Sequence, residues 1–151
     1  ALDKLQQPQE TVEKPMDAQT WWTGFRQQHQ TDKIKFSEEI TAPREIPDEC
    51  FNSVLENLLD NVRNKANAEP EIAVEVKLHC SEDRVRLTVT DTGSALTADL
   101  ADRLFTRAVD SNDGLGIGLY QAHKQAALAG YALRLAHNEP GKVSFELSNQ
   151  Q

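Results

Sequence analysis

Residues 46–68 carry the pattern that most restricts how this chain can fold. Apolar side chains recur at positions 51, 54, 55, 58, 59 and 62, which is the spacing of one buried stripe on an α-helix. Two segments of alternating apolar residues follow, 71–80 and 84–90, and they predict two strands joined through residues 81–83. A long amphipathic helix beside a hairpin indicates a helix packed on a sheet.

The flanking segments extend this arrangement. A short helix capped by Asp17 is expected, with Trp22 and Phe25 turned inward. Further predicted elements are a strand at 33–40, helices at 97–105 and 117–129, and a closing hairpin of 131–137 and 142–148. The predicted fold class is an α/β two-layer sandwich, with one mixed β-sheet of about five strands and helices packed on one face. Residues 1–19, polar and containing two prolines, are expected to be a linker or truncated upstream segment.

Composition excludes several classes of function. The net charge of −8 over 151 residues argues against a nucleic-acid surface, which needs clustered Lys and Arg. There is no apolar run of membrane-spanning length and no charged-then-apolar leader. Cys50 and Cys80 have no metal-binding spacing and are expected to be reduced, buried thiols.

Three asparagines lie beside the buried stripe of the long helix. Asn57, Asn61 and Asn64 stand at i, i+4 and i+7, so they form a polar stripe roughly 120° from the centre of the apolar one. Asparagine is a mediocre helix former, and its repetition has two interpretations. One is a solvated helix face. The other is an amide oxygen ligand for a hard cation such as Mg²⁺, which shares phosphates and keeps several waters.

A second polar cluster, Asp91-Thr92-Gly93-Ser94, stands at the end of a predicted strand. A carboxylate there can accept a hydrogen bond from an exocyclic amine, and the glycine lets the backbone approach a flat ring. An ordinary turn is one alternative. Another is the aspartic protease motif, whose paired aspartates activate water. That family is almost all β, and a single copy would need a homodimer.

The third pattern is the glycine-rich stretch 113–120, with Gly114, Gly116 and Gly118. It lacks the lysine of a P-loop, and it lacks both the spacing and the preceding strand of the dinucleotide fingerprint. A glycine-rich loop that runs into a helix N-terminus favours phosphate binding, because N–H groups and the helix dipole point at the ligand. Close packing of the helix start against a neighbour would explain the same glycines.

The order of these patterns is more specific than any one of them. N-x-x-x-N on a helix, D-x-G after a strand, R-L-F at a helix end and G-x-G-x-G-L before a helix follow one another within residues 46–149. This combination resembles the ATP-binding catalytic domain of sensor histidine kinases, in the GHKL superfamily with gyrase, MutL and the heat-shock chaperones. The resemblance implies the Bergerat ATP-binding fold, with residues 20–151 as the catalytic domain.

The resemblance also implies roles for residues on the long helix. Asn61 is the expected Mg²⁺ ligand, and Asn57 is an expected contact near the phosphates. Gyrase-type hydrolases have a water-activating Glu four residues before the metal-binding Asn, where this chain has Asn57. Phosphoryl transfer to another protein is therefore expected rather than robust hydrolysis.

At the other two motifs, the resemblance implies that Asp91 binds the adenine amino group with Gly93 beneath the ring. Residues 106–113 would close as a lid, and the three glycines that follow would bring backbone amides to the phosphates. Such a site works by positioning and charge neutralisation. The remaining residues of the expected ATP-binding set are Asn64, Lys65, Ala95, Leu96, Gly114, Leu115, Gly116, Gly118, Leu119 and Ser144.

Several positions depart from the family pattern. Ala95 stands where the first glycine box usually has its second glycine, and Ala108 stands where an aromatic is frequent. Asn64 and Lys65 occupy the positions that usually hold a lysine and an aromatic. Because the lid has no lysine, Arg107 is expected to act in catalysis by neutralising the γ-phosphate, with a displaced Lys65 as the alternative.

The phosphoacceptor is not expected within this chain. The four histidines precede Gln30, Cys80, Lys124 and Asn138, whereas the acceptor histidine of such kinases precedes an acidic residue. The expected partners are therefore a histidine-bearing dimerisation domain of the same parent protein, upstream of residue 1, and the receiver domain of a response regulator. The domain itself is expected to be cytoplasmic, including in a parent anchored in the inner membrane, with no membrane or nucleic-acid contact.

Three functions are consistent with the sequence. The first is the ATP- and Mg²⁺-binding catalytic domain of a two-component sensor histidine kinase. The second is a degenerate module that binds nucleotide or a partner without phosphotransfer, which Ala95 and the altered lid favour. The third, more remote, is the aspartic protease.

Overall fold

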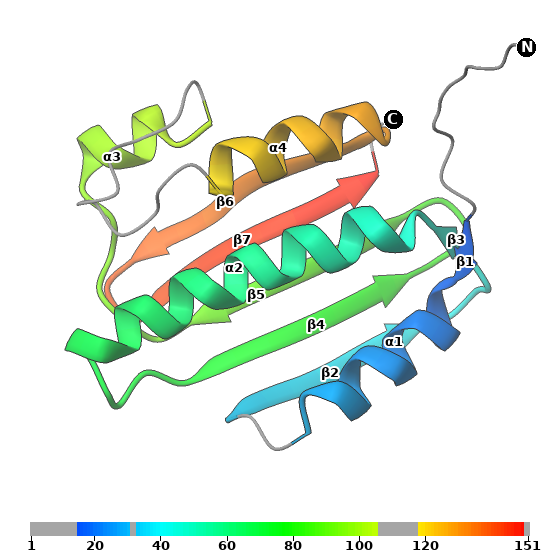
Figure 1. The fold of residues 1–151 in the computed structure, drawn as a ribbon, viewed down its shortest axis with the longest axis horizontal. Helices are drawn as coiled ribbons and strands as arrows, with labels where there is room; N and C mark the ends of the chain where they lie inside the picture. The colour runs from blue at the N-terminus through cyan, green and yellow to red at the C-terminus, as the bar shows by residue number, and fades with distance from the viewer. Residues whose placement is uncertain (1–14, 31–32, 106–117, 150–151) are drawn as a thin grey trace, which may run out of the picture.

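The computed structural model describes residues 15–30, 33–105 and 118–149, in which α1, α2 and α4 lie over one face of a five-stranded sheet (Figure 1). The elements in chain order are β1 (Met16–Asp17), α1 (Ala18–Gln28), β2 (Ile34–Ile40), β3 (Glu45–Ile46), α2 (Asp48–Ala68), β4 (Val74–Cys80), β5 (Val85–Asp91), α3 (Ala98–Arg103), α4 (Gly118–Leu128), β6 (Tyr131–Glu139) and β7 (Lys142–Asn149).

The main sheet has the strand order β2-β4-β5-β7-β6. β2 pairs with β4 in parallel, and the β4–β5, β5–β7 and β6–β7 pairs are antiparallel. A five-stranded mixed sheet with helices on one face was the prediction from sequence, and it is confirmed. The separate β1–β3 ladder was not predicted, because two-residue strands carry no periodic pattern.

The core lies between the helices and the covered face of the sheet. α2 buries the whole predicted apolar stripe. Full burial of a Leu, Val or Phe side chain contributes about 1.5–3 kcal/mol to the stability of the folded state. The buried residues of α2 are Cys50, Phe51, Val54, Leu55, Leu58, Leu59 and Val62. α1 behaves as expected: Asp17 accepts a hydrogen bond from the Thr20 backbone N–H at its N-terminus, and Trp22 and Phe25 are buried.

Part of the segment expected to be a linker belongs to the fold. Met16 and Asp17 pair with Ile46 and Glu45 in the β1–β3 ladder, and Ala18 is 1% exposed. Residues 1–14 lie outside the described part of the chain. The folded unit therefore includes residues 16–19, which were assigned to the linker.

Two further expectations concern the thiols and the membrane. Cys50 and Cys80 are both buried, as expected, and burial raises the pKa of the Cys80 thiol above its ordinary value. Among the helices of the described residues, none has the length and apolar character needed to cross a bilayer.

Candidate functional site

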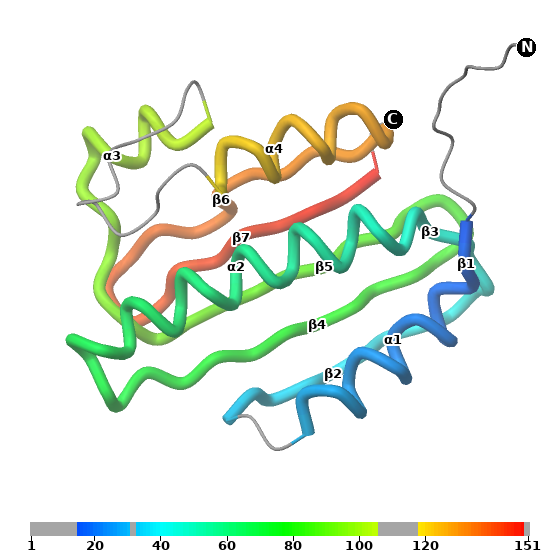
Figure 2. Tube along the Cα trace, viewed as in Figure 1, coloured from blue at the N-terminus to red at the C-terminus, as the bar shows by residue number. Residues whose placement is uncertain are grey.

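A cavity of about 230 Å³ is lined by residues of the C-terminal half of α2, the end of β5, the loop after β5 and the start of β7. Figure 2 shows these segments together at one end of the sheet. Apolar side chains from α2, β5, β7 and the loop after β5 make most of its wall, and a few polar groups converge on it, as is typical of small-molecule sites. The lining residues are Leu58, Asn61, Val62, Asn64, Lys65, Val89, Asp91, Ser94, Ala95, Leu96, Val143 and Phe145.

Asp91 is the buried acid of this cavity. The alternation of β5 turns positions 85, 87, 89 and 91 toward the covered face, so the last inward position of a core strand is a carboxylate. Its side chain is 7% exposed. Asp91 Oδ1 accepts hydrogen bonds from the Gly93 backbone N–H at 2.8 Å and from Lys65 Nζ at 3.0 Å. Burial of a carboxylate is costly unless it is paired in this way.

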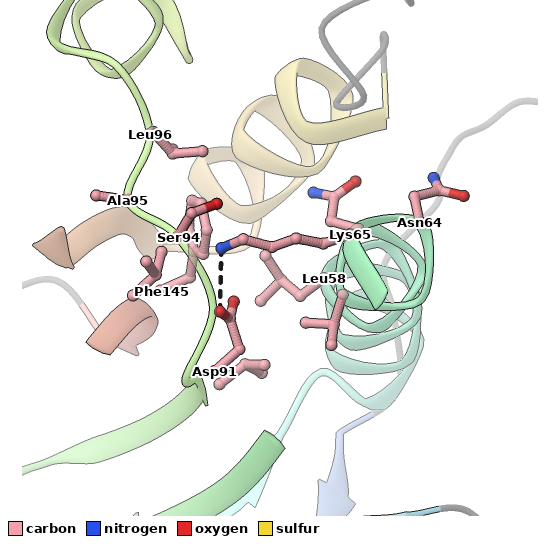
Figure 3. Close-up of a pocket in the computed structure, with 12 residues that line it drawn as sticks. Leu58, Asn64, Lys65, Asp91, Ser94, Ala95, Leu96 and Phe145 are labelled. Carbon is pink, nitrogen blue, oxygen red and sulfur yellow. Dashed lines mark hydrogen bonds and ion pairs between the residues drawn. The ribbon is translucent and has the colours of Figure 1, made fainter. Parts of the chain in front are cut away.

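Lys65 reaches across the cavity from α2 to Asp91, as Figure 3 shows. Its stem lies against Gly93, where an added Cβ would be 2.9 Å from Lys65 Cε and 2.6 Å from Ile72 Cδ1. No side chain fits at Gly93 without displacing these neighbours. In this structure the atoms that approach Gly93 closely belong to Lys65 and Ile72, and the predicted approach of a flat ring to this glycine stays a prediction.

The three asparagines of α2 do not share one environment. Asn61 lines the cavity, and among the described residues its buried Nδ2 has no hydrogen-bond partner. Asn64 also lines the cavity and is exposed. Asn57 lies outside the lining: its Nδ2 donates to the Ser53 carbonyl at 3.0 Å, and its Oδ1 faces Gly118.

The loop after β5 is fixed by contacts that the sequence did not indicate. Glu69, the C-cap residue that follows α2, accepts hydrogen bonds from the Ser94 backbone N–H and hydroxyl at 2.9 and 2.7 Å. The Ser94 hydroxyl thereby holds the pKa of the Glu69 carboxyl below its ordinary value. From the other side, the Asn138 side-chain amide accepts from the Leu96 N–H at 2.8 Å and donates to the Leu96 carbonyl at 3.0 Å.

The Gly141 N–H also donates to the Gly93 carbonyl at 2.9 Å, and together with the Glu69 and Asn138 contacts this bond clamps the loop after β5. The residues that form the clamp are far apart in sequence: Asn138, for example, is 42 residues from Leu96. No local pattern signals such a contact. The loop that carries Ser94, Ala95 and Leu96 to the cavity is consequently held from both sides.

Other residues of the expected site lie elsewhere. Ser144 is turned to the opposite face of the sheet from its neighbours Val143 and Phe145, and it hydrogen-bonds to Thr90. Leu119 is buried in the core, and Gly118 contacts Asn57 rather than lining the cavity. Four expected site residues lie outside the described residues: Arg107, Gly114, Leu115 and Gly116.

The cavity offers a metal few protein ligands of its own. In the described ranges, no group of three or more His, Cys, Asp or Glu side chains is placed to hold a metal ion. The buried polar atom that lacks a protein partner in the described residues is Asn61 Nδ2, which is a donor and cannot bind a cation. Asn61 Oδ1 would be the ligand for Mg²⁺, an ion that is commonly bound by few side chains together with phosphate oxygens and water.

A family model described as "Histidine kinase-, DNA gyrase B-, and HSP90-like ATPase" matches residues 49–150. The chain belongs to this family. The match covers the cavity and every expected site motif, and it assigns a nucleotide-binding ATPase domain. Membership in this ATPase family excludes the aspartic protease interpretation of Asp91-Thr92-Gly93-Ser94, and Asp91 is paired with Lys65.

Relatives within the family include sensor kinases. The chain is 28% identical over 107 residues to the adaptive-response sensory kinase SasA of Gloeothece citriformis, covering 64% of this chain and 26% of that protein. It is 29% identical over 99 residues to the sensor histidine kinase CitA of Klebsiella pneumoniae, covering 63% of this chain and 18% of that protein. The chain thus spans about a quarter or less of the length of these relatives.

Solved structures of this ATPase family share the fold. A mycobacterial sensor histidine kinase, MprB, superposes with a TM-score of 0.67 at 20% identity, covering 90% of this chain and 97% of that one. The catalytic domain of the histidine kinase ThkA gives 0.67 at 17% identity, covering 92% of this chain and 95% of that one. The histidine kinase catalytic fold expected from sequence is confirmed.

Proposed function

We propose that this chain is the ATP-binding catalytic domain of a two-component sensor histidine kinase, and that it transfers the γ-phosphoryl group of ATP to a histidine on a dimerisation domain of the same parent protein. An aspartate in a response regulator receiver domain would then accept the phosphoryl group. Family membership and the sensor kinases among the relatives support this assignment.

The observation that carries the proposal is the pairing of two polar groups across one apolar cavity. Asp91, 7% exposed at its side chain, faces the cavity from β5, and Asn61 faces it from α2 with a buried Nδ2 group that has no partner in the described residues. A buried polar group without a protein partner is costly and is rarely kept without a function. Within the described residues, Lys65 and Gly93 both donate to Oδ1 of Asp91, so Oδ2 is the oxygen we assign to the adenine amino group.

The residues around the cavity then have defined tasks. Asp91 accepts the amino N–H of the base, the clamped loop at Ser94 to Leu96 forms one wall, and Phe145 and Leu58 exclude water from the base. Asn61 would hold Mg²⁺ through its amide oxygen. When bound, the ion would supply charge neutralisation at the phosphate oxygens. Asn57 stands where hydrolases of the superfamily keep their water-activating Glu, which favours transfer over hydrolysis.

A titration with a non-hydrolysable ATP analogue, with and without Mg²⁺, tests the nucleotide site. Amide NMR shifts are expected at residues 61–65 and 91–96, and the affinity is expected to rise with Mg²⁺. Shifts confined to the uncovered face of the sheet would contradict the proposed site. Transfer of labelled γ-phosphate to the upstream dimerisation domain of the parent protein then tests the kinase activity itself.

A second candidate is a regulatory module that binds nucleotide without transferring phosphate. It is favoured by one observation: the position that usually holds a lysine is the exposed Asn64, and the lysine one residue later is bound to Asp91. Nucleotide binding without phosphotransfer to the dimerisation domain would select this candidate.

A further inference from the structure

Lys65 lies in the part of the cavity that the proposed base contact requires. Its ammonium group is 3.0 Å from Asp91 Oδ1, and the two side chains are 18% and 7% exposed. Its Cε lies against the backbone of Gly93, where a Cβ would meet it at 2.9 Å. One side chain therefore covers both the carboxylate and the glycine surface proposed for the base.

The surroundings of Lys65 hold it in that position. Ile72 Cδ1 and Lys65 Cε would lie 2.6 and 2.9 Å from a Cβ placed on Gly93, so the stem lies close to both Ile72 and Gly93. The Asp91 carboxylate is fixed in turn by the Gly93 N–H at 2.8 Å. An ion pair that is largely withdrawn from water is not cheaply broken by removing one partner, because the remaining charge loses its compensation.

We propose that Lys65 is a competitor for the base subsite that is built into this domain, and that it sets the affinity for adenine nucleotides. The inference rests on the proposed function, because it takes Asp91 and Gly93 as the base contacts. An adenine ring reaches these two residues only after the Lys65 stem leaves Gly93. The apparent affinity for adenine nucleotides is then proportional to the fraction of molecules in which Lys65 is displaced.

The proposed role and the role expected from sequence predict opposite changes in ATP affinity when the charge of Lys65 is removed. If a displaced Lys65 neutralised the γ-phosphate, removing its charge would weaken ATP binding. If Lys65 competes with the base, removing its charge tightens ATP binding, because Asp91 keeps its acceptor oxygens and loses its internal partner. The gain is confined to ligands that contain the base, and tripolyphosphate gains nothing.

The test compares Lys65→Met and Lys65→Gln with the unmodified chain. Lys77→Met is the matched control, because Lys77 is an exposed lysine on β4 whose neighbours Val76 and Leu78 point into the core. Calorimetry measures the dissociation constants for a non-hydrolysable ATP analogue and for tripolyphosphate. Both Lys65 variants are expected to bind the ATP analogue about tenfold tighter, to bind tripolyphosphate no tighter, and Lys77→Met is expected to change neither.

Equal or weaker binding of the ATP analogue by both Lys65 variants, with binding by the unmodified chain intact, would overturn the inference and leave the proposed function standing. Absence of binding by the unmodified chain and by both variants would overturn the proposed function as well. A measurement without substitution guards against misfolded variants. The ¹³Cε signal of Lys65 in the unmodified chain is expected to shift as adenosine saturates the site, and an unmoved signal would contradict displacement.

Discussion

Asn57 of α2 lies directly against Gly118, the first residue of α4: an added Cβ on Gly118 would stand 2.5 Å from Asn57 Oδ1. The amide cannot turn away freely, because its Nδ2 donates to the Ser53 carbonyl at 3.0 Å. At this glycine, close packing against a neighbour explains the residue without a phosphate. The last glycine of the glycine-rich stretch thus serves the fold at the point where α4 begins.

Gly118→Ala is expected to lower the free energy of unfolding by about 1–2 kcal/mol. The methyl group displaces Asn57, and this cost exceeds the gain of up to about 1 kcal/mol in helix propensity. Urea denaturation of a double-mutant cycle with Asn57→Ala measures the coupling. In the Asn57→Ala background the substitution should be neutral or stabilising. Equal destabilisation in both backgrounds would show that the contact is not the cause.

Asn61→Ala is expected to abolish the Mg²⁺-dependent part of ATP-analogue binding without lowering stability. The Asn61 Nδ2 group is buried without a partner in the described residues, so its removal relieves an unfavourable burial while removing the proposed metal ligand. Asn52→Ala is the matched control, because Asn52 lies on the same helix and accepts a hydrogen bond from Trp21 Nε1 at 2.8 Å. It should lower stability by about 1 kcal/mol and leave affinity unchanged. An unchanged dissociation constant for Asn61→Ala in Mg²⁺ would rule out the metal role.

Asp91→Asn is expected to weaken binding of the ATP analogue at least tenfold and to leave tripolyphosphate binding unchanged. The amide has one acceptor oxygen, and its NH₂ group cannot accept the amino N–H of the base. Calorimetry with both ligands measures the difference, with Asp99→Asn on α3 as a control because Asp99 is 80% exposed. Equal losses for the two ligands would show that Asp91 does not recognise the base.

Tyr131 is expected to make folding stability fall in alkaline solution. It is 7% exposed and packs edge-on against Phe51, and burial raises its pKa from 10 to about 12. Because the folded state holds the proton more tightly, this stabilising contribution is complete below pH 10 and is lost as the pH rises toward 12. The loss amounts to about 3 kcal/mol. Urea denaturation across this range should give a shallower decline for Tyr131→Phe than for the unmodified chain, and an equal decline would show that Tyr131 is not its cause.

The elements that sequence patterns located are those whose cause is local. The apolar stripe of α2 and the alternation of β5 each follow from side-chain spacing, so the burial of Leu58 and Val89 could be read from the chain. The same spacing turns Asp91 toward the helices. The alternation of β7 likewise points Ser144 away from the side of Val143 and Phe145. The family resemblance included Ser144 in the expected site although this alternation places it on the other face of the sheet.

The parts of the site that sequence could not predict depend on contacts between distant segments. Lys65 and Asp91 are 26 residues apart, and nothing in either motif indicates that the two side chains form an ion pair. Glu69 and Ser94 are 25 residues apart, and both look like ordinary helix-end and turn residues. Such pairings follow from sheet register and helix position, which single-segment periodicity does not determine.

Asn138→Ala is expected to loosen the loop after β5 and to weaken nucleotide binding through it. The substitution removes the partners of the Leu96 N–H and carbonyl, which the Asn138 amide holds at 2.8 and 3.0 Å, and two lost hydrogen bonds cost about 1–3 kcal/mol. Hydrogen exchange at the Leu96 amide should accelerate, and the ATP-analogue affinity should fall.

Asn149→Ala is the comparison, because the Asn149 amide bonds to Val85 N–H and the Asp83 carbonyl at the opposite end of β5. Asn149→Ala should also lower the free energy of unfolding. It should leave the ATP-analogue affinity unchanged, and hydrogen exchange at the Leu96 amide should accelerate no more than the loss of global stability accounts for. Equal affinity losses for the two variants would mean that general destabilisation, and not the position of Leu96, controls binding.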